Sequence, residues 1–472
     1  MREVRVAPTP LDRLAPLLGP ERAAGLEGGA GVARELLAGR VVWNVNTTAS
    51  GGGVAEMLAT LLGYTRGADI DSRWLVLEGT PRFFEITKRL HNMLHGSPGD
   101  GGPLGAREHR EYEQVLSENL EQLLGRVHPG DVVLLHDPQT AGLAGGLRHA
   151  GAHVVWRCHV GRDAPNEHTE RGWAFLRQYV EGVEASIYSR AVYAPTWADH
   201  TMRVIPPSLD PFSAKNTLLA PADVEAALRQ SGLVDEAPAG DATFRRRDGS
   251  LGRVRRHRQL FAAGGPVPGD VRVVVQVSRW DRLKDMAGVL EAFADHVREL
   301  PDDVHLVLVG PEVSGVSDDP EGAEVLEECC SSWRSQAEAV RRRTHLVTLP
   351  MDDGEENAHL VNALQHHASV VVQKSLVEGF GLTVTEPMWK SRPVVASRVG
   401  GIQDQIVDGV SGLLVSDPAD AAEFSGLVRM VLSDSSLAAR LGREAHERVR
   451  SQYLGDRHLL QYVDLFAELL HE

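Results

Sequence analysis

The chain has 472 residues, of which 42% are hydrophobic, so it is long enough for two separate cores. Its formal net charge is −16, and such a charge repels a phosphate backbone and disfavours nucleic acid as a partner. No apolar run reaches the roughly 18 residues that a membrane span needs, and the N-terminal residues lack an apolar signal core. The 3 cysteines form neither a paired framework nor a CxxC metal motif. We therefore expect a cytoplasmic protein without a membrane span, a metal site or a nucleic-acid partner.

Strand-like runs rich in Val and Leu alternate with helical patterns along the whole chain. They show little polar–apolar alternation, as strands buried on both faces should. This alternation of strands and helices predicts an α/β fold with two doubly wound parallel sheets. The predicted strands lie at residues 41–45, 73–78, 131–137, 153–160 and 185–189, and at 272–279, 304–310, 345–350, 369–375 and 392–397.

A Gly- and Pro-rich stretch at 261–270 separates the two sets of strands and predicts a domain boundary. We assign residues 1–262 to an N-terminal Rossmann-like domain and residues 263–445 to a C-terminal one. Residues 446–472 have apolar side chains at helical spacing, which predicts a helix that packs back toward the N-terminal domain. The Arg-rich segment 243–258 is interpreted as a solvated excursion rather than an anion site.

Three consecutive glycines, Gly51, Gly52 and Gly53, follow the first predicted strand in the stretch NTTASGGGVAEML. In open α/β sheets ligands bind beyond the carboxyl ends of the strands, and glycine lets backbone N–H groups approach an anion. The triplet matches neither a Walker loop nor GxGxxG. Taken alone, it is as consistent with a close-packed turn as with a ligand loop.

The second half has polar residues at corresponding places. Arg279 and Lys284 follow one predicted strand, and SLVEGFGLTVTEPMW, with Glu378 and Glu386, follows another. A Gly-rich turn before a helix can bind an anion, and carboxylates at both places suit a ligand rich in hydroxyl groups. The alternative for each Glu is a helix cap or a surface charge.

Lysine is rare, which gives a second indication. Most of the 49 basic residues are Arg, so a Lys can mark a position that requires a compact ammonium group, although for any single Lys chance is the better explanation. The lysines are Lys88, Lys215, Lys284, Lys374 and Lys390.

The stretch SLVEGFGLTVTEPMWKSRPVVAS, followed by VGGIQDQIVDGVSGLLV, resembles the C-terminal signature of retaining GT-B glycosyltransferases of glycosyltransferase family 4. In the first half, VNTTASGGGVAEML, FFEITKRLHNMLHG, LLHDPQTAGL, WRCHVGRDAPNEH and IPPSLDPFSAKN are similar to the trehalose glycosyltransferring synthases. The resemblance implies a GT-B fold, with two Rossmann-like domains facing a cleft. It implies that residues 1–262 bind the acceptor and residues 263–445 bind a nucleotide-sugar donor.

The implied reaction joins glucose from a nucleotide diphosphate-glucose to free glucose through an α,α-1,1 bond, with retention and without a metal or other cofactor. Arg279 and Lys284 would neutralise the diphosphate, Glu386 would hold the ribose hydroxyls, and Glu378 would hold the donor sugar. His159 would face that sugar near the reacting carbon. The implied catalytic residues are His159, Arg279, Lys284 and Glu378. The implied donor-binding residues are Gly51, Gly52, Gly53, Arg279, Lys284, Glu378, Gly379, Phe380, Gly381, Leu382, Thr383 and Glu386.

The acceptor site is less well defined by the sequence. His91 and Asn92 are candidates, although a His on a helix face is more often packed or solvated. Asp137 and Gln139 follow a strand end, where a contact with a sugar hydroxyl and a capping role are equally plausible. For Arg157, within a strand, a structural ion pair competes with acceptor contact.

One departure from the family pattern leaves the acceptor open. After Arg-Cys-His the family commonly has Ile-Asp, but this chain has Val160 and Gly161, with Asp163 two residues further on. A glucose analogue, an amino sugar or an aminocyclitol is therefore an alternative acceptor.

Other functions remain open at this point: a phosphate-dependent disaccharide phosphorylase, a transferase of specialised metabolism, and an inactive sugar-nucleotide sensor or scaffold. The sequence also leaves open the nucleotide base, the physiological direction and whether the chain forms a homodimer.

Overall fold

The computed structural model describes residues 1–49, 53–237, 240–313 and 320–470. The chain forms two compact units. Unit 1 comprises Met1–Leu209 and Tyr453–Glu472, and unit 2 comprises Asp210–Gln452. Each unit is built around a seven-stranded sheet.

The sheet of unit 1 has the strand order β1-β3-β2-β4-β5-β6-β7. All neighbours are parallel except β1, which pairs with β3 in the antiparallel sense. The order reverses between β2 and β4, which is where an open α/β sheet leaves a crevice beyond its strand ends. The strands are β1 (Arg2–Val4), β2 (Val42–Asn46), β3 (Ser72–Val76), β4 (Val132–His136), β5 (His153–Cys158), β6 (Ala185–Tyr188) and β7 (Met202–Val204).

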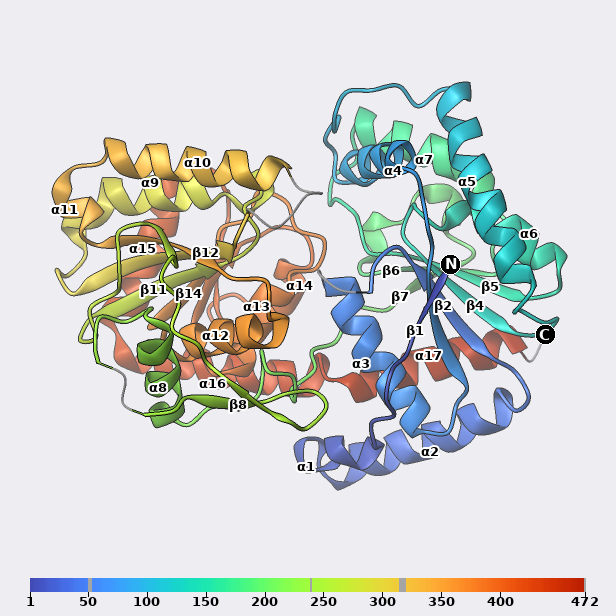
Figure 1. Ribbon diagram of the computed structural model, residues 1–472, viewed down its shortest axis with the longest axis horizontal. Coiled ribbons are helices and arrows are strands. Elements are labelled where there is room, and N and C mark those ends of the chain that lie inside the picture. Colours follow the sequence, from blue (N-terminus) through green and yellow to red (C-terminus); the bar gives the residue numbers. More distant parts are fainter. Residues whose placement is uncertain (50–52, 238–239, 314–319, 471–472) are drawn as a thin grey trace. The chain divides into compact units, whose positions relative to one another are not determined.

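Helices cover both faces of this sheet (Figure 1). Trp43 and Val45 of β2 enter a core with α4, α5 and α7, whereas Val42 and Asn44 face α2, α3 and α17 around a small apolar cavity. Side chains alternate between the two faces of a strand, so a strand covered on both faces reads as a continuous apolar run. The helices of unit 1 are α1 (Ala15–Leu18), α2 (Pro20–Leu36), α3 (Gly53–Gly67), α4 (Pro81–Leu94), α5 (Ala106–Leu124), α6 (Ala144–His149), α7 (Glu167–Val180) and α17 (Gly455–Leu470).

The sheet of unit 2 has the order β10-β13-β12-β11-β14-β15-β16, and only β10 is antiparallel to its neighbour. Its order reverses between β11 and β14. A separate two-stranded hairpin is formed by β8 and β9. The strands are β8 (Thr243–Arg245), β9 (Leu251–Arg253), β10 (Phe261–Ala263), β11 (Arg272–Val277), β12 (Val304–Pro311), β13 (Thr344–Leu349), β14 (Val370–Gln373), β15 (Val394–Ser397) and β16 (Leu413–Val415).

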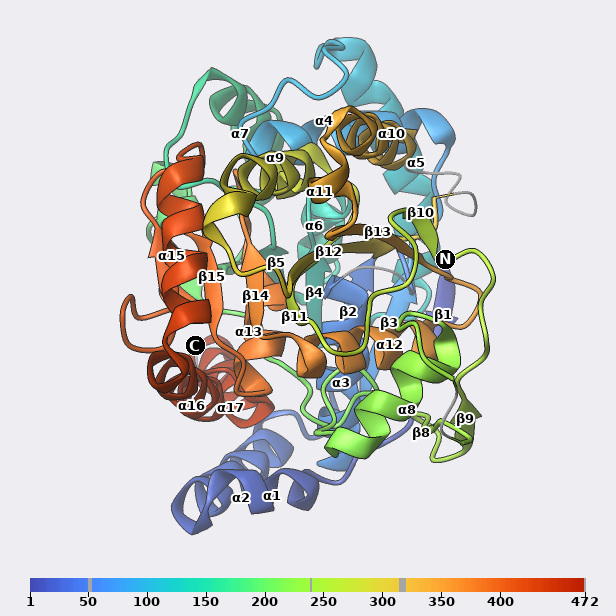
Figure 2. The same ribbon diagram turned by 90° about the vertical axis from the view of Figure 1, so that its left-hand side faces the viewer.

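Figure 2 shows α9 and α10 on one side of the unit 2 sheet and α8 and α12 on the other. Val274 of β11 packs in the core that contains α9, and Val273 and Val275 pack in the core that contains α12. The helices are α8 (Pro221–Ser231), α9 (Met286–His296), α10 (Pro320–Ser335), α11 (Glu338–Arg341), α12 (Gly354–His367), α13 (Leu382–Trp389), α14 (Ile402–Gln405), α15 (Ala421–Ser433) and α16 (Ser435–Gln452). Short 3₁₀ helices lie at Leu11–Leu14, Ala141–Leu143, Ala191–Tyr193, Thr196–Ala198, Arg282–Lys284 and Val297–Glu299.

The predicted fold class is confirmed: both sheets are doubly wound and parallel except for one antiparallel edge strand each, and all the predicted strands are present with ends shifted by no more than 2 residues. The strands that the sequence did not indicate are β1, β7, β8, β9, β10 and β16, each 3 residues long. Such short strands at sheet edges and in a hairpin offer too few residues for a periodic pattern.

The boundary between the units lies after Leu209, not at residue 262. Residues 210–262 belong to unit 2 because α8 packs on α12 and because Asn362 Nδ2 donates to the carbonyls of Ala214 and Thr217, at 3.1 and 2.7 Å. The Gly- and Pro-rich stretch 261–270 begins with β10, an edge strand of unit 2. Likewise the chain returns to unit 1 at Tyr453 rather than at residue 446, since α16 belongs to unit 2.

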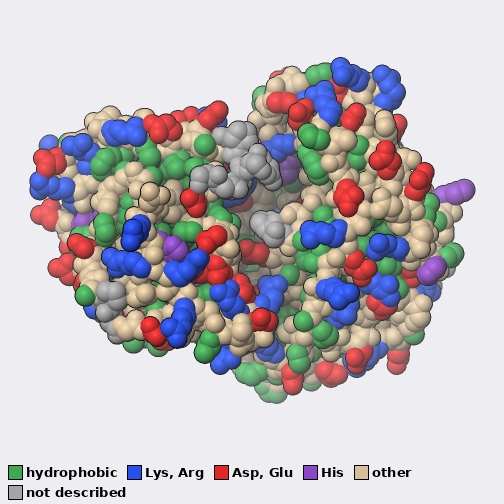
Figure 3. All heavy atoms as spheres, in the orientation of Figure 1, with side chains coloured by type: hydrophobic (Ala, Val, Ile, Leu, Met, Phe, Trp, Pro, Cys, Tyr) green, Lys and Arg blue, Asp and Glu red, His purple; other side chains and the backbone are tan. Residues whose placement is uncertain are grey.

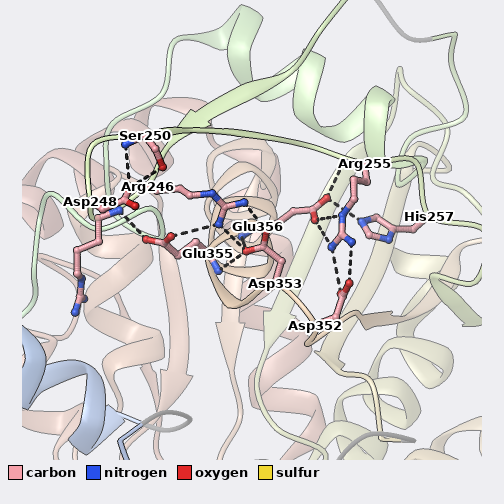
Figure 4. Close-up of polar contacts among 10 residues, drawn as sticks. Arg246, Asp248, Ser250, Arg255, His257, Asp352, Asp353, Glu355 and Glu356 are labelled. Atoms are coloured by element: carbon pink, nitrogen blue, oxygen red, sulfur yellow. Dashed lines mark hydrogen bonds and ion pairs between the residues drawn. The ribbon is translucent and has the colours of Figure 1, made fainter. Parts of the chain in front are cut away.

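Most side chains of the Arg-rich segment 243–258 are exposed, as expected for a solvated excursion, but two of its arginines anchor it to the rest of unit 2. Figure 4 shows its arginines reaching the acidic start of α12: Arg246 pairs with Asp353, and Arg255 pairs with Glu356. Asp353 is the N-cap of α12, and its carboxylate accepts from backbone N–H groups in the first turn of the helix. Phe244 of the same segment is buried.

Acidic and basic side chains are interspersed on the face of each unit drawn in Figure 3. Many of them form ion pairs, such as Arg272 with Asp303 at 2.6 Å. Among the described helices, none is both long and apolar enough to cross a membrane.

Candidate active site

Lys284 and Glu378 meet at the point where the strand order of unit 2 reverses. Lys284 ends a 3₁₀ turn beyond β11, and Glu378 lies in the turn beyond β14. Lys284 Nζ is 2.6 Å from Glu378 Oε2, and the two side chains are 15% and 12% exposed. Because β11 and β14 are neighbours, their carboxyl ends bring these two segments together.

The amide of Gln276, in β11, fixes both segments. Its Nε2 donates to the carbonyl of Lys284 at 2.7 Å, and its Oε1 accepts from the backbone N–H of Lys374 at 3.2 Å. The ammonium of Lys374 in turn pairs with Asp285. Gln276 is fully buried, and its two hydrogen bonds fix the positions of the segments after β11 and β14 relative to each other.

Arg279 also lies beyond β11, and its side chain is 53% exposed. Its Nη2 is 3.1 Å from Asp281 Oδ2. Asp281 also accepts a hydrogen bond from the backbone N–H of Leu283 at 2.8 Å, so this carboxylate links Arg279 to the turn that carries Lys284.

The Gly-rich turn before α13 is tightly constrained. Gly381, the N-cap of α13, has φ +90°, and a Cβ there would lie 3.1 Å from the Cγ of Glu378. The carbonyl of Gly379 accepts from the N–H of Gly401 at 3.2 Å, and the carbonyl of Phe380 accepts from Gln405 Nε2 at 2.5 Å. Leu382 and Thr383 follow in the first turn of α13 and are half-buried.

Glu386 lies further along α13 and is 5% exposed. Its Oε1 is 3.7 Å from Lys215 Nζ, and its Oε2 is 3.4 Å from Gln365 Nε2. Lys390, one turn further on, is buried beneath it. Burial lowers the pKa of Lys390 to about 7, and the Glu386 carboxylate opposes that shift.

In unit 1, His159 follows β5 and meets residues of β4 and β2. Its Nε2 is 3.1 Å from His136 Nδ1, and His136 Nε2 is 3.0 Å from Asn44 Oδ1. An amide oxygen only accepts, so His136 donates from Nε2 and accepts from His159 at Nδ1. Burial lowers the pKa of His136 to about 3 and that of His159 well below its usual value, so both rings are neutral at pH 7.

Asp137 directly follows β4 and has φ +66°. Its Oδ1 accepts from the backbone N–H of His159 at 2.8 Å, so it fixes the segment that carries the His159 ring. Burial raises the pKa of Asp137 to about 7, and the hydrogen bond from His159 opposes this rise. Gln139 lies two residues further on and is half-buried.

The guanidinium of Arg157 is buried and is held by α17 and the segment after β7. It lies 2.5 Å from Tyr462 Oη and 3.0 Å from His458 Nε2, and it donates to the carbonyl of Ile205 at 3.0 Å. These contacts match the structural alternative for Arg157, although the partners are neutral groups rather than a carboxylate.

The remaining acceptor candidates lie on α4. His91 and Asn92 are half-buried near its C-terminal end, with His91 Nδ1 3.5 Å from Asn92 Oδ1. The ring of His91 packs edge-on against His95, with centroids 4.9 Å apart.

The structure explains the glycine that departs from the family pattern. A Cβ at Gly161 would lie 2.1 Å from the Cγ of Tyr193, so the ring of Tyr193 occupies the space of a side chain at this position. Asp163 does not lie there: it is exposed and pairs with Arg190.

Two of the three glycines in the triplet, Gly51 and Gly52, lie outside the described residues. Gly53 opens α3 and is exposed. Within the ranges that the structure describes, there is no group of three or more His, Cys, Asp or Glu side chains that could hold a metal ion.

In each unit, buried polar residues near the predicted site residues carry no signal in the sequence: Asn44 and His136 in unit 1, and Gln276 and Gln365 in unit 2. They sit inside strands or on helix faces, where the pattern indicates only burial. The rarity of Lys was the useful signal, because Lys215, Lys284, Lys374 and Lys390 all contact segments at the predicted donor site.

Comparisons with known proteins cover both units. Residues 44–195 match the family model described as trehalose synthase, N-terminal domain, and residues 258–448 match the model for glycosyl transferases group 1. A trehalose synthase from Pyrococcus horikoshii is 33% identical over 436 residues, which is 92% of this chain and 91% of the relative. Another from Rubrobacter xylanophilus is 34% identical over 442 residues, 92% of each chain.

A more distant relative is a trehalose phosphorylase from Pleurotus sajor-caju, 25% identical over 86% of this chain but only 55% of that protein. Among solved structures, an α,α-trehalose-phosphate synthase (UDP-forming) from Burkholderia vietnamiensis has a TM-score of 0.66 at 16% identity, over 92% of this chain and 99% of that one. This structural likeness shows the fold. The chain therefore belongs to the trehalose synthase family of glycosyltransferases and has the GT-B fold.

Proposed function

We propose that the protein is a retaining glycosyltransferase that moves glucose from a nucleotide diphosphate-glucose to free glucose and forms the α,α-1,1 disaccharide, without a metal or other cofactor. The observation that carries this proposal is the pairing of Lys284 with Glu378 where the strand order of unit 2 reverses. It places a cation and a hydroxyl-binding carboxylate where an open α/β sheet binds ligands. The trehalose synthase relatives support the choice of product.

In this proposal unit 2 binds the donor. Lys284 and Arg279 neutralise the diphosphate, Glu378 and the backbone of the turn through Gly381 hold the sugar, and Glu386 holds the ribose. Negative charge develops on the departing diphosphate, and fixed cations stabilise it without reorganisation during the reaction.

The chemical step we propose occurs on one face of the sugar. The bond from the anomeric carbon to the diphosphate oxygen breaks, and its electron pair stays on that oxygen. The acceptor hydroxyl oxygen bonds to the anomeric carbon from the same face and passes its proton to the leaving phosphate. This route needs no carboxylate nucleophile, unlike the covalent route of retaining hydrolases. Trapping a glycosyl–enzyme adduct would contradict it.

We propose that unit 1 binds the acceptor through His91, Asn92, Asp137 and Gln139, with His159 near the reacting carbon. Asp137 fits this role because its carboxylate also holds the His159 backbone. Tyr193 fills the space beside Gly161 where the family commonly has a carboxylate side chain. An amino sugar or an aminocyclitol is therefore the alternative acceptor to test beside glucose.

A donor panel tests the reaction class. The protein is incubated with each nucleotide diphosphate-glucose and, separately, with α-glucose 1-phosphate, in the presence of glucose and with or without a chelator. We expect turnover with a nucleotide donor that the chelator does not abolish. Turnover with α-glucose 1-phosphate alone would instead support the phosphorylase suggested by the Pleurotus sajor-caju relative, and no turnover with any donor would support a sensor.

A further inference from the structure

The ammonium group of Lys390 has a complete set of hydrogen-bond acceptors. Its Nζ lies 2.8 Å from Gln365 Oε1, 3.1 Å from the carbonyl oxygen of Glu386 and 3.2 Å from Asn216 Oδ1. An ammonium has three N–H groups and no acceptor, so these contacts use all of its hydrogens. Lys390 is 3% exposed, so protein groups rather than water hold its ammonium group.

Lys390 also decides how the Gln365 amide is oriented. Because Lys390 can only donate, the amide oxygen of Gln365 must face it, and the amide nitrogen must point the other way. That nitrogen, Nε2, lies 3.4 Å from Oε2 of Glu386. Gln365 is fully buried in α12, so the amide has no contact with water that would compete with this arrangement.

The second oxygen of Glu386 faces Lys215, with Oε1 and Nζ 3.7 Å apart. Lys215 lies in the segment that opens unit 2, and Asn362 holds that segment through the carbonyls of Ala214 and Thr217. A carboxylate offers about four acceptor sites on its two oxygens. Gln365 uses one acceptor site on Oε2, and Lys215 pairs with Oε1 at a distance longer than a hydrogen bond, so both oxygens keep acceptor capacity for a pair of neighbouring hydroxyl groups.

We propose that Lys390, acting through Gln365, is a positioning residue that holds the Glu386 carboxylate in the orientation in which it accepts both hydroxyls of the donor ribose, with Lys215 holding its other oxygen. This inference rests on the proposed nucleotide-sugar donor and its binding by Glu386. Holding the carboxylate before the donor arrives removes the entropy cost of ordering a long side chain on binding.

The choice of residue supports a positioning role over a role in packing. A buried ammonium is expensive to desolvate, and apolar side chains of similar volume often replace buried charges without loss of stability. Met would fill the same space without that cost, but it could not orient the Gln365 amide.

Nucleoside diphosphate binding by calorimetry tests this inference at pH 6, where the ammonium form of Lys390 predominates. Titration with UDP, ADP and GDP first shows which nucleoside diphosphate the wild-type protein binds. The affinities for the 2′-deoxy and 3′-deoxy forms of that nucleotide are then measured. We expect the wild type to prefer the ribose form by roughly tenfold or more per hydroxyl, the scale of a hydrogen bond to a charged group. In Lys390→Met and Gln365→Met this preference falls to about twofold, because affinity for the ribose form falls and affinity for the deoxy forms does not.

A double-mutant cycle tests whether Lys390 acts through Gln365. If it does, the combined variant Lys390→Met/Gln365→Met binds the ribose form no more weakly than Lys390→Met alone, within about twofold. Additive losses would overturn the indirect route. His359→Leu is the matched control: His359 lies on the same helix and stacks on Phe244, so its loss lowers the unfolding midpoint but leaves the ribose preference at the wild-type value.

The outcomes separate this inference from the function on which it rests. Folded Lys390→Met or Gln365→Met protein with wild-type ribose preference overturns the positioning role. Wild-type protein that binds a nucleoside diphosphate without any ribose preference overturns it too, while the nucleotide-sugar donor stands. Wild-type protein that binds none of the nucleoside diphosphates contradicts the donor itself. If Lys390→Met fails to fold, Gln365→Met, which removes a neutral group, still decides the question.

Discussion

Lys284 and Glu378 pair with each other where the strand order of the unit 2 sheet reverses. This ion pair holds the ammonium group in place beside the turn that carries Glu378. A diphosphate that reaches this site meets a cation already positioned by the turn after β11 and by the Gln276 amide. The importance of such preorganisation can be measured by removing the cation.

We predict that Lys284→Ala lowers kcat roughly 10²–10³-fold, because one aimed positive group is lost from the leaving diphosphate. Lys88→Ala is the matched control, since Lys88 is exposed on α4 and the change is chemically the same. Steady-state kinetics with the preferred donor gives both values. A wild-type kcat in Lys284→Ala would contradict the role assigned to this lysine.

Gly161 allows a stability prediction at the same scale. A methyl group there would lie 2.1 Å from the Cγ and 2.6 Å from the Cβ of Tyr193, atoms too close to the backbone to move freely. We therefore expect Gly161→Ala to lower the free energy of unfolding by about 1–3 kcal/mol, the usual cost of overpacking. In Gly145→Ala, within α6, the added methyl meets open space, so this control is neutral or more stable. Chemical denaturation measures the free energy of unfolding of both variants. A Gly161→Ala variant as stable as the wild type would contradict the steric requirement for glycine at this position.

At the scale of elements, the start of α12 shows how the Arg-rich segment 243–258 is anchored. Asp353 caps the helix by accepting from the N–H groups of Glu355 and Glu356, at 3.2 and 3.1 Å, and it pairs with Arg246 of the Arg-rich segment (Figure 4). The Arg246 side chain and the backbone N–H groups hold the pKa of Asp353 well below its usual value.

We predict that Asp353→Ala lowers the free energy of unfolding by about 1–2 kcal/mol at pH 7, and that Asp353→Asn costs less because Asn also caps helices. The folded-state pKa of this carboxyl is depressed, so the stability that its charge contributes is complete above about pH 4 and is lost as the pH falls further. The difference between wild type and Asp353→Asn should therefore shrink below pH 4. A difference that stays constant from pH 7 to pH 3 would show that the charge contributes nothing.

Much of the fold could be predicted because long strands buried on both faces are continuous apolar runs. The domain boundary could not be predicted, because no local sequence pattern shows that α8 packs on α12. The glycines and prolines that suggested a boundary instead follow β10, an edge strand within unit 2. The same holds for the site. Lys284 and Glu378 follow strand ends, where polar residues stand out, but Gln276 and Gln365 lie within a strand and a helix, where the pattern indicates only burial.

For the whole molecule, the two units repeat one design: a doubly wound sheet whose reversal point gathers polar side chains. In unit 1 this point brings Asn44 of β2 and His136 of β4 together, and in unit 2 it brings Lys284 and Glu378 together. Membership of the trehalose synthase family and the GT-B fold are established by the comparisons. The identity of the donor, the identity of the acceptor and the retention of configuration are proposals that experiments must test.

The most direct test is the linkage of the product formed from a nucleotide diphosphate-glucose labelled with ¹³C at its anomeric carbon and unlabelled glucose, followed by NMR. We predict a non-reducing disaccharide in which the labelled carbon keeps the α configuration of the donor and is bonded to the α-anomeric oxygen of the second glucose. A β-configured labelled carbon would contradict retention. A reducing product, or transfer only to an acceptor other than glucose, would contradict the proposed synthesis of the α,α-1,1 disaccharide.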